Sequence, residues 1–439
     1  MIGALPASLH GLGAGLLLLV VLALVVTRPR GLDVAWFAGV GGALAVVSGL
    51  LPFPAVGSII AQTWDAVVTL IALVLLSQAL ESNRFFDWAA SHVARAAVGS
   101  GWRLYALVLL LTAAVAALLA NDGAVLMLTP IYATLLRTVY RDDQAAVRLP
   151  FLLATGFFAD AMSALFIPSN LTNIIVADAT GLDVPSAALH LAAPMAAAFL
   201  VGGAAFALRF RHRLGTPYDP TGPADPATII RDRIVFWAGW TALGGMVAGY
   251  IVGGNLRLPV ASVALPAGVA MLALVDRRQL RSAREVLATA PWPVLVYALG
   301  MFAVLTAAYD AGVLGGLVGL LRDAARPGTG FPGIFAVGGL ATLISAAVNN
   351  LPAALLGVFA LGGSHGAHTA TYALILGVDI GPKLTPFGSL ATLLWLRILA
   401  QHDIRVSWGQ YIRENWWVTL LVVGASLGVL GLSQALLGG

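Results

Sequence analysis

The chain has 439 residues, of which 59% are hydrophobic and only 10% are charged, and its formal net charge is +4. Soluble domains carry about 25% charged residues, and apolar runs of about 20 residues recur along the whole sequence, so we expect a polytopic helical membrane protein rather than a soluble one. The sequence contains no cysteine, which excludes disulfides and thiolate metal sites. Its excess of arginine lies at the edges of apolar runs, where it sets membrane orientation rather than nucleic-acid binding.

Uninterrupted membrane spans are predicted first. They lie at 9–27, 33–51, 62–81, 188–208, 233–253, 258–276, 291–309 and 415–436. The segment before the first span has no basic residue, so 9–27 is interpreted as a retained span and not as a signal peptide. Residues 84–98 combine Arg84, Asp87 and Arg95 with aromatic residues and predict an amphipathic helix at the membrane interface.

Four other apolar stretches are longer than 30 residues and are interrupted by polar residues. They are 104–138 around Asn121-Asp122-Gly123, 149–180 around Pro168 to Asn173, 331–362 around Asn349-Asn350-Leu351-Pro352, and 369–400 around Lys383 to Ser389. A straight helix of that length would measure about 45–50 Å, whereas the hydrocarbon core is about 30 Å thick. Each stretch is therefore predicted to form two short helices that meet at a polar break.

The arginines predict how these segments cross the membrane. We place the loop with Arg28 and Arg30 in the cytoplasm, make 104–138 and 331–362 re-entrant hairpins, and let 149–180 and 369–400 cross once. Twenty of the 23 arginines then lie in the cytoplasm, and both termini are on the periplasmic side.

This arrangement repeats within the chain. Each half has three spans, a re-entrant hairpin, a broken span and a final span, and the two halves enter the membrane from opposite sides. The sequence thus predicts an all-α inverted repeat of ten spans plus two hairpins, the plan of secondary transporters whose sites lie at broken helices. Its parts are a first repeat at 1–210, a cytoplasmic linker at 211–231 and a second repeat at 232–439.

Lys383 is the only lysine of the chain and lies within one of the breaks. An ionisable group at membrane depth is costly and marks a functional site by default. The candidate partners of its ammonium group are Asp379, Asp122 and Asp160, and all four residues are candidates for proton coupling. A structural role for each of them, as a helix cap or as a partner that only holds the break, remains open.

The breaks also carry neutral hydrogen-bonding groups. The candidate solute-binding residues are Asn121, Asp122, Ser169, Asn170, Thr172, Asn173, Asn349, Asn350, Thr385 and Ser389. Together with free backbone groups at helix ends, such residues suit a small polyhydroxylated or oxyanionic solute. His365 and His368 are spaced like a metal pair, but nothing in the sequence joins them, and no metal site or cofactor is predicted. A nucleotide-binding loop of Walker type is absent, so ATP hydrolysis by that route is excluded and the chain is predicted to be a transporter and not an enzyme.

Several of these motifs resemble one known family. They are Ala-Leu-Leu-Ala-Asn-Asp-Gly-Ala-Val-Leu-Met-Leu-Thr-Pro (117–130), Ser-Asn-Leu-Thr-Asn-Ile-Ile (169–175), Asn-Asn-Leu-Pro (349–352), Asp-Ile-Gly-Pro-Lys-Leu-Thr-Pro-Phe-Gly-Ser-Leu-Ala-Thr-Leu-Leu-Trp-Leu (379–396) and Ser-Trp-Gly-Gln-Tyr (407–411). Over nearly its whole length the chain resembles the arsenite efflux permeases, the ArsB-type arsenical pump membrane proteins of the ion-transporter superfamily.

This resemblance implies export of trivalent arsenic and antimony hydroxides (arsenite and antimonite) across the bacterial inner membrane. Such permeases work alone on the proton gradient or together with a cytosolic ArsA-type ATPase. Because this chain has no cysteine, it would have to bind arsenite through hydrogen bonds to the hydroxyl groups. The alternatives left open are a sodium/proton antiporter or dicarboxylate carrier of the same superfamily, and a passive metalloid channel.

Overall fold

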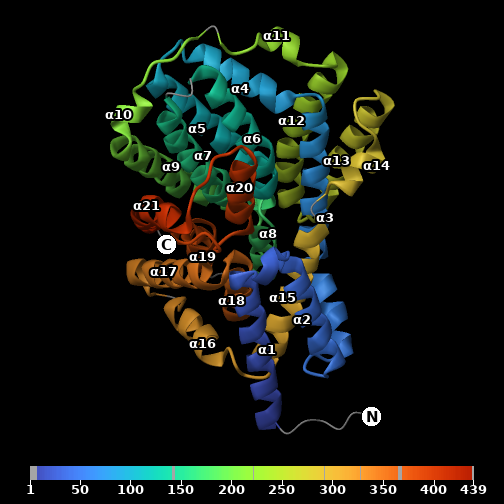
Figure 1. Cartoon of the computed structure of the whole chain (residues 1–439). Helices are drawn as coiled ribbons and strands as arrows, with labels where there is room; N and C mark the ends of the chain where they lie inside the picture. The colour runs from blue at the N-terminus through green and yellow to red at the C-terminus, as the bar shows by residue number, and fades with distance from the viewer. Residues whose placement is uncertain are drawn as a thin grey trace.

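The computed structural model describes residues 7–140, 144–220, 222–290, 292–326, 328–363 and 368–437. Within these ranges every regular element is helical (Figure 1). Nine helices in this described part are long and apolar enough to cross a membrane. The chain is therefore an all-α, multi-pass membrane protein, as the composition predicts.

The first half of the chain forms nine α-helices and a set of short 3₁₀ turns. They are α1 (Ala7–Thr27), η1 (Pro29–Gly31), α2 (Val34–Val47), α3 (Phe53–Ser82), α4 (Phe85–Ala96), α5 (Gly101–Leu118), α6 (Asn121–Val139), α7 (Ala145–Ala161), η3 (Met162–Leu165), η4 (Ile167–Ser169), α8 (Leu171–Thr180) and α9 (Val184–Arg209).

The connection and the second half follow. They are α10 (Arg211–Leu214), α11 (Pro226–Ile229), α12 (Arg233–Asn255), α13 (Ala261–Arg277), α14 (Ala283–Ala288), α15 (Trp292–Asp310), α16 (Gly315–Ala324), α17 (Gly330–Val348), α18 (Asn350–Leu361), α19 (His368–Ile380), η5 (Gly381–Leu384), α20 (Leu390–Gln401) and α21 (Trp408–Leu437).

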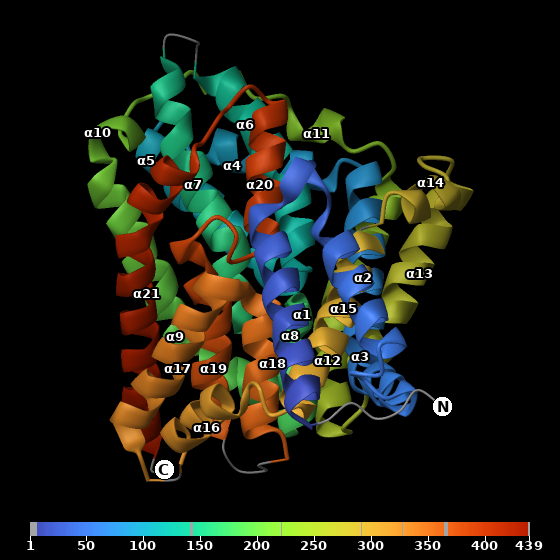
Figure 2. The same cartoon turned by 60° about the horizontal axis from the view of Figure 1, so that its bottom comes forward.

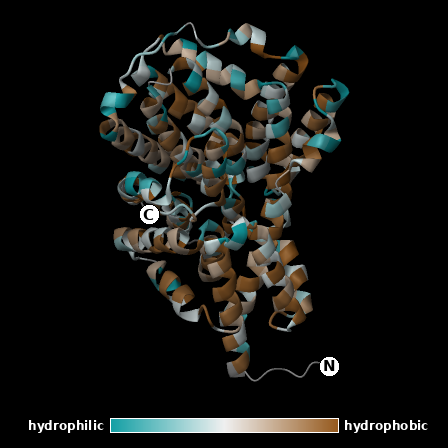
Figure 3. Cartoon of the chain, in the orientation of Figure 1, coloured by the Kyte–Doolittle hydropathy of each residue, from teal (hydrophilic) through white to brown (hydrophobic). Residues whose placement is uncertain are grey.

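Each uninterrupted span predicted from the sequence corresponds to a helix, with shifts at its ends. The largest shift is in α3, which begins at Phe53 instead of residue 62 because Pro52 and Pro54 start a helix well: Pro54 occupies its first turn, where a missing N–H costs nothing. The helices consist largely of hydrophobic residues, and many of the hydrophilic residues lie at helix ends and in connecting loops (Figure 3).

The four long apolar stretches are all broken, as predicted. The breaks separate α5 from α6, α7 from α8, α17 from α18, and α19 from α20. Two of them are wider than expected, because α7 already ends at Ala161 and α19 at Ile380, and 3₁₀ turns follow. Asp160 and Asp379 therefore lie at the edge of a break.

The broken segments meet near the middle of the molecule. The α6 helix packs against α20, and α8 packs against α18, so each of these contacts joins the two halves of the chain. Around them, α2 packs on α15, α3 on α13 and α9 on α21. The start of α1 and the end of α21 lie at one end of the molecule, opposite α10, α11 and α14 (Figure 2).

The connection at 211–231 is fastened to α4, whose bounds agree with the predicted amphipathic segment. The Ser91 hydroxyl donates to the Ala224 carbonyl at 2.5 Å, and Arg95 pairs with Asp225 at 3.3 Å. The buried hydroxyl of Tyr218 donates to the Ala94 carbonyl at 2.5 Å. Burial raises the pKa of Tyr218, so its hydroxyl stays protonated to a higher pH than that of an exposed tyrosine. The connection is thus bound along its length to the first half.

Candidate functional site

Two breaks with similar construction face one another. In the first, η3 and η4 lead to Asn170, whose side-chain oxygen accepts from the Thr172 N–H at 3.3 Å and caps α8. In the second, η5 is followed by an extended Thr385, and Ser389 accepts from the Ala391 N–H at 3.2 Å and caps α20. Each break therefore ends on a polar cap that starts the next helix.

Lys383 lies in η5 and is completely buried. Its ammonium group is 2.5 Å from Oδ2 of Asp160 and donates to the Thr392 hydroxyl at 2.7 Å. The other oxygen of Asp160 accepts from the Asn121 side-chain amide at 2.7 Å. This chain of contacts joins the start of α6, the first break and the second break.

Asp379 is the second buried carboxylate of the site, and it is surrounded by neutral donors. Its Oδ1 accepts from the amide of Asn170 at 2.9 Å, and its Oδ2 accepts from the amide of Asn173 at 2.7 Å. The Ser163 hydroxyl donates to Oδ2 at 3.2 Å, and the Thr172 hydroxyl lies 3.5 Å from Oδ1. All four donors come from the first half, whereas Asp379 belongs to the second.

The break between α17 and α18 lies against the second break. Asn349 has a positive φ of 94°, and its amide donates to the Phe387 carbonyl at 3.2 Å. The N–H of Asn350 donates to the Gly388 carbonyl at 2.9 Å. The Tyr297 hydroxyl donates to the Asn349 side-chain oxygen at 3.2 Å, which holds the strained residue in place.

The chain is similar to known proteins over nearly its whole length. The family model described as arsenical pump membrane protein (ArsB) matches residues 13–432. An arsenical pump membrane protein of Yersinia enterocolitica is 37% identical over 433 residues, which cover 95% of this chain and 98% of the relative. One from Escherichia coli strain K12 is 36% identical with the same coverage. A putative arsenical pump membrane protein of Bacillus subtilis is 29% identical and covers 90% of this chain and 93% of its own length.

The chain belongs to the arsenical pump membrane protein family. The resemblance inferred from the motifs is confirmed, and the chain is a transporter in the sense of this family. Within it, the structure brings Asn121, Asp160, Asn170, Asn173 and Lys383 into the buried contacts described above, together with Thr172 and Asp379.

Two other predicted residues lie close by, and their hydroxyl groups donate hydrogen bonds to backbone carbonyls. Ser169 donates to the carbonyls of Ser163 and Phe166, and Thr385 donates to the Ala346 carbonyl at 2.7 Å. Asp122 accepts no side-chain hydrogen bond within the described part of the chain, although its backbone N–H donates to Asn121. The carboxylate of Asp122 lies within electrostatic range of Asp160 and Lys383.

Three residues of this candidate site were not predicted: Ser163, Thr392 and Tyr297. The first two lie in apolar helical sequence, where a lone Ser or Thr usually bonds to the preceding turn of its own helix. The sequence gives one weak indication for Ser163: it follows Asp160 by three residues and so lies near that carboxylate on a helix. No group of three or more metal-ligating side chains occurs among the described residues, and His365 lies outside them.

Proposed function

We propose that this member of the arsenical pump family exports the neutral hydroxides of trivalent arsenic and antimony from the cytoplasm in exchange for protons. The relatives are named arsenical pump membrane proteins, which supports arsenic as the element carried. The absence of cysteine and the abundance of amides and hydroxyls in the breaks support binding through hydrogen bonds instead of As–S bonds.

The observation that carries this proposal is the environment of Asp379. The side chain is 1% exposed and has no ion pair within the described residues, because the ammonium of Lys383 is already paired with Asp160. An isolated buried charge is costly enough that such a group is normally neutralised. Two things can satisfy this carboxylate: a proton, or the hydroxyl groups of a bound solute that donate to it.

Competition between these two occupants gives antiport. A trihydroxide offers both O–H donors, which suit the carboxylate, and oxygen acceptors, which suit the amides of Asn170 and Asn173. A proton on Asp379 removes the negative charge that these O–H groups need, so the site holds either the solute or the proton. Because the solute is neutral, each exchange moves net charge inward, and a membrane potential of 100 mV contributes about 2.3 kcal/mol per proton.

In this proposal Lys383 and Asp160 form a fixed pair and Asp379 is the proton carrier. The pair neutralises itself and ties Asn121 of the hairpin tip to both breaks. Asp122, the third carboxylate at this depth, lies near the pair. This assignment narrows the set of proton-coupling candidates left open by the sequence.

The inverted repeat at 1–210 and 232–439, with ten spans, two hairpins and a cytoplasmic linker, is also part of the proposal. In such a repeat α2 corresponds to α13, α3 to α15, α6 to α18 and α8 to α20. Contacts between the halves support it because they occur in equivalent pairs. The α2–α15 contact is matched by α13–α3, and the α6–α20 contact is matched by α18–α8. The final spans α9 and α21 pair with one another. The arginine distribution then places both termini on the periplasmic side of the inner membrane.

The burial of the charged residues of the site favours a carrier over a passive channel. Lys383 is 0% exposed and Asp160 and Asp379 are each 1% exposed, so no open pore reaches them. Association with an ArsA-type ATPase remains a prediction of the family resemblance. It would supply energy from outside the chain without changing the site.

Arsenite uptake into inverted membrane vesicles tests the proposed function. We expect accumulation when the vesicle interior is acidified and its loss when an uncoupler collapses the proton gradient. Equal uptake with and without the gradient would favour the channel. Sodium-dependent proton exchange without arsenite uptake would favour the sodium/proton antiporter.

A further inference from the structure

A cavity in the described part of the protein shares no lining residue with the buried contacts around Lys383 and Asp379. Its volume is about 1220 Å³, and Arg257, one of the few arginines predicted to lie on the periplasmic side, is among its lining residues. Its walls come from both halves: α3, η4, α8 and the start of α9 on one side, and the α12–α13 connection and α18 on the other.

The inner wall of the cavity adjoins the break that binds Asp379. Ile167 of η4 and Ile175 of α8 line it, although only 1% and 2% of their surfaces are exposed. Ile167 precedes Asn170 by three residues, and Ile175 follows Asn173 by two. Where they line the cavity they form an apolar floor, and they are its lining residues nearest in sequence to the amides that hold Asp379.

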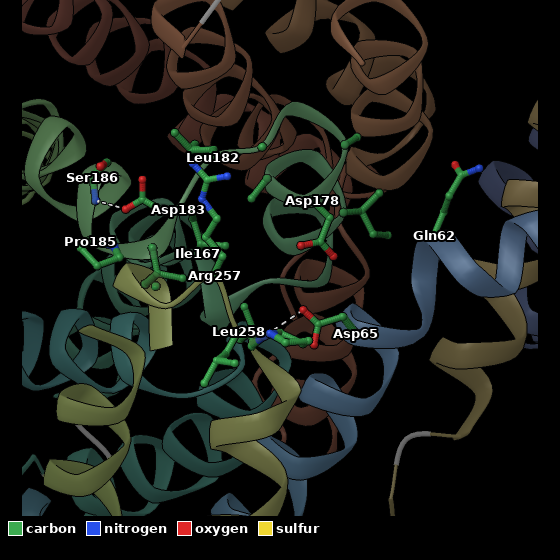
Figure 4. A pocket seen from close by; sticks show the side chains of 18 of the residues that line it. Gln62, Asp65, Ile167, Asp178, Leu182, Asp183, Pro185, Ser186, Arg257 and Leu258 are labelled. Carbon is green, nitrogen blue, oxygen red and sulfur yellow. Dashed lines mark hydrogen bonds between the residues drawn. The ribbon is translucent and has the colours of Figure 1, made fainter. Parts of the chain in front are cut away.

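The charged groups that face the cavity are Asp65, Asp178, Asp183, Arg257 and His368. Two of the carboxylates hold backbone: Asp65 accepts from the N–H groups at the start of α13 at 2.9 and 2.7 Å, and Asp183 accepts from the N–H of Ser186 at 2.8 Å. Figure 4 shows Asp178 on α8 pointing toward the same space as Asp65 on α3.

Asp178 differs from the other two carboxylates. It has no hydrogen bond or ion pair within the described residues and is exposed to the cavity. It also lies in the last turn of α8, where the helix dipole disfavours a negative charge. The presence of an aspartate at this position is therefore not explained by a contribution to helix stability. At 1.5 Å per residue, its position is about 8 Å along the helix from Asn173.

We propose that this cavity is the outer vestibule of the transport path, where the exported trihydroxide is released and protons enter, with Asp178 as a proton-accepting side chain on its wall. The inference rests on the proposed function. In the present conformation the vestibule is open to the outside and closed toward Asp379 by Ile167 and Ile175. Movement of α8 against α3 would open the floor, since these two helices meet along the cavity.

The natural absence of cysteine makes this vestibule directly testable. Gln62→Cys and Ser186→Cys place single thiols on its wall, and Ser262→Cys places a matched thiol on the exposed start of α13, outside the cavity. A bulky, membrane-impermeant maleimide is added to right-side-out vesicles, excess reagent is removed, and arsenite flux is measured.

We expect all three thiols to react from the outside. Modification of Gln62→Cys or Ser186→Cys should reduce arsenite flux to the level of vesicles without the protein, and modification of Ser262→Cys should leave it unchanged. Full flux after complete modification of both wall positions, or reaction only from the cytoplasmic side, would overturn the vestibule. If the parent protein carries arsenite without moving protons, the proposed proton coupling is wrong. Loss of arsenite flux after modification of the wall thiols would still show that the cavity is part of the transport path.

The role of Asp178 needs a second readout. In Asp178→Asn we expect slower proton-driven transport, most strongly when external protons are scarce at high pH, with an unchanged KM for arsenite and recovery in Asp178→Glu. Asp183→Asn is the control, because asparagine also caps a helix. A pH profile of Asp178→Asn identical to that of the parent would overturn the role of this carboxylate.

Discussion

Replacing Lys383 by methionine removes the positive member of a fully buried ion pair while keeping a side chain of similar length. The change leaves the Asp160 carboxylate, 1% exposed, with only the Asn121 amide as a donor. Breaking a buried pair by removing one partner costs about 3–5 kcal/mol. We therefore expect Lys383→Met to lower the melting temperature of the purified protein clearly and to abolish proton-coupled arsenite export.

The double variant Lys383→Met/Asp160→Asn distinguishes the loss of the ion pair from the cost of leaving one buried charge without its partner. Both charges are then gone, the amide oxygen introduced by Asp160→Asn still accepts from Asn121, and most of the lost stability should return, as thermal unfolding in detergent measures. Arg95→Ala is the matched control, because it breaks an ion pair whose side chains are 49% and 60% exposed and which is worth about 0–1 kcal/mol. The reasoning is refuted if Lys383→Met melts like the parent, or if the double variant is less stable than both single variants. Full proton-coupled export by Lys383→Met would show that the lysine only holds the broken helix.

Three further predictions concern the framework of the site. Gly377→Ala should destabilise the α17–α19 contact, since a Cβ there would meet the Gly338 carbonyl, whereas Gly339→Ala, with open space around it, should be neutral in the same melting assay. Ser389→Ala should cost about 1 kcal/mol through loss of the α20 cap, and Ser389→Asn should restore it, which thermal unfolding would again report. Asp65→Ala should lower stability more than Asp65→Asn, because two buried N–H groups at the start of α13 lose their acceptor; equal melting of the two variants would speak against this.

The positions of the breaks could be predicted from the sequence because their cause is local. Proline, glycine and asparagine interrupt runs that are otherwise apolar, and a helix of more than 30 residues does not fit the membrane. The widths of the breaks could not be predicted. The 3₁₀ turn η3 (Met-Ser-Ala-Leu) contains neither glycine nor proline, and only packing decides that the α-helix ends before it.

The partner of Lys383 shows why the site itself was only partly predictable. Asp379 precedes it by four residues, which on a continuous helix would place the two side chains together. The helix ends at Ile380, however, and η5 turns Lys383 toward Asp160 in the other half of the chain. Asp379 is left to the amides of Asn170 and Asn173. Such pairings across the halves depend on tertiary structure and leave no trace in local spacing.

The exchange of a proton for arsenite at Asp379 is tested most directly by arsenite-driven proton movement. Proteoliposomes carrying a pH-sensitive dye are exposed to an arsenite gradient, and the internal pH is followed. The account predicts proton flux opposite to arsenite in the parent protein and in the Asp183→Asn control, and none in Asp379→Asn. Proton movement by Asp379→Asn at the rate of the parent would contradict it.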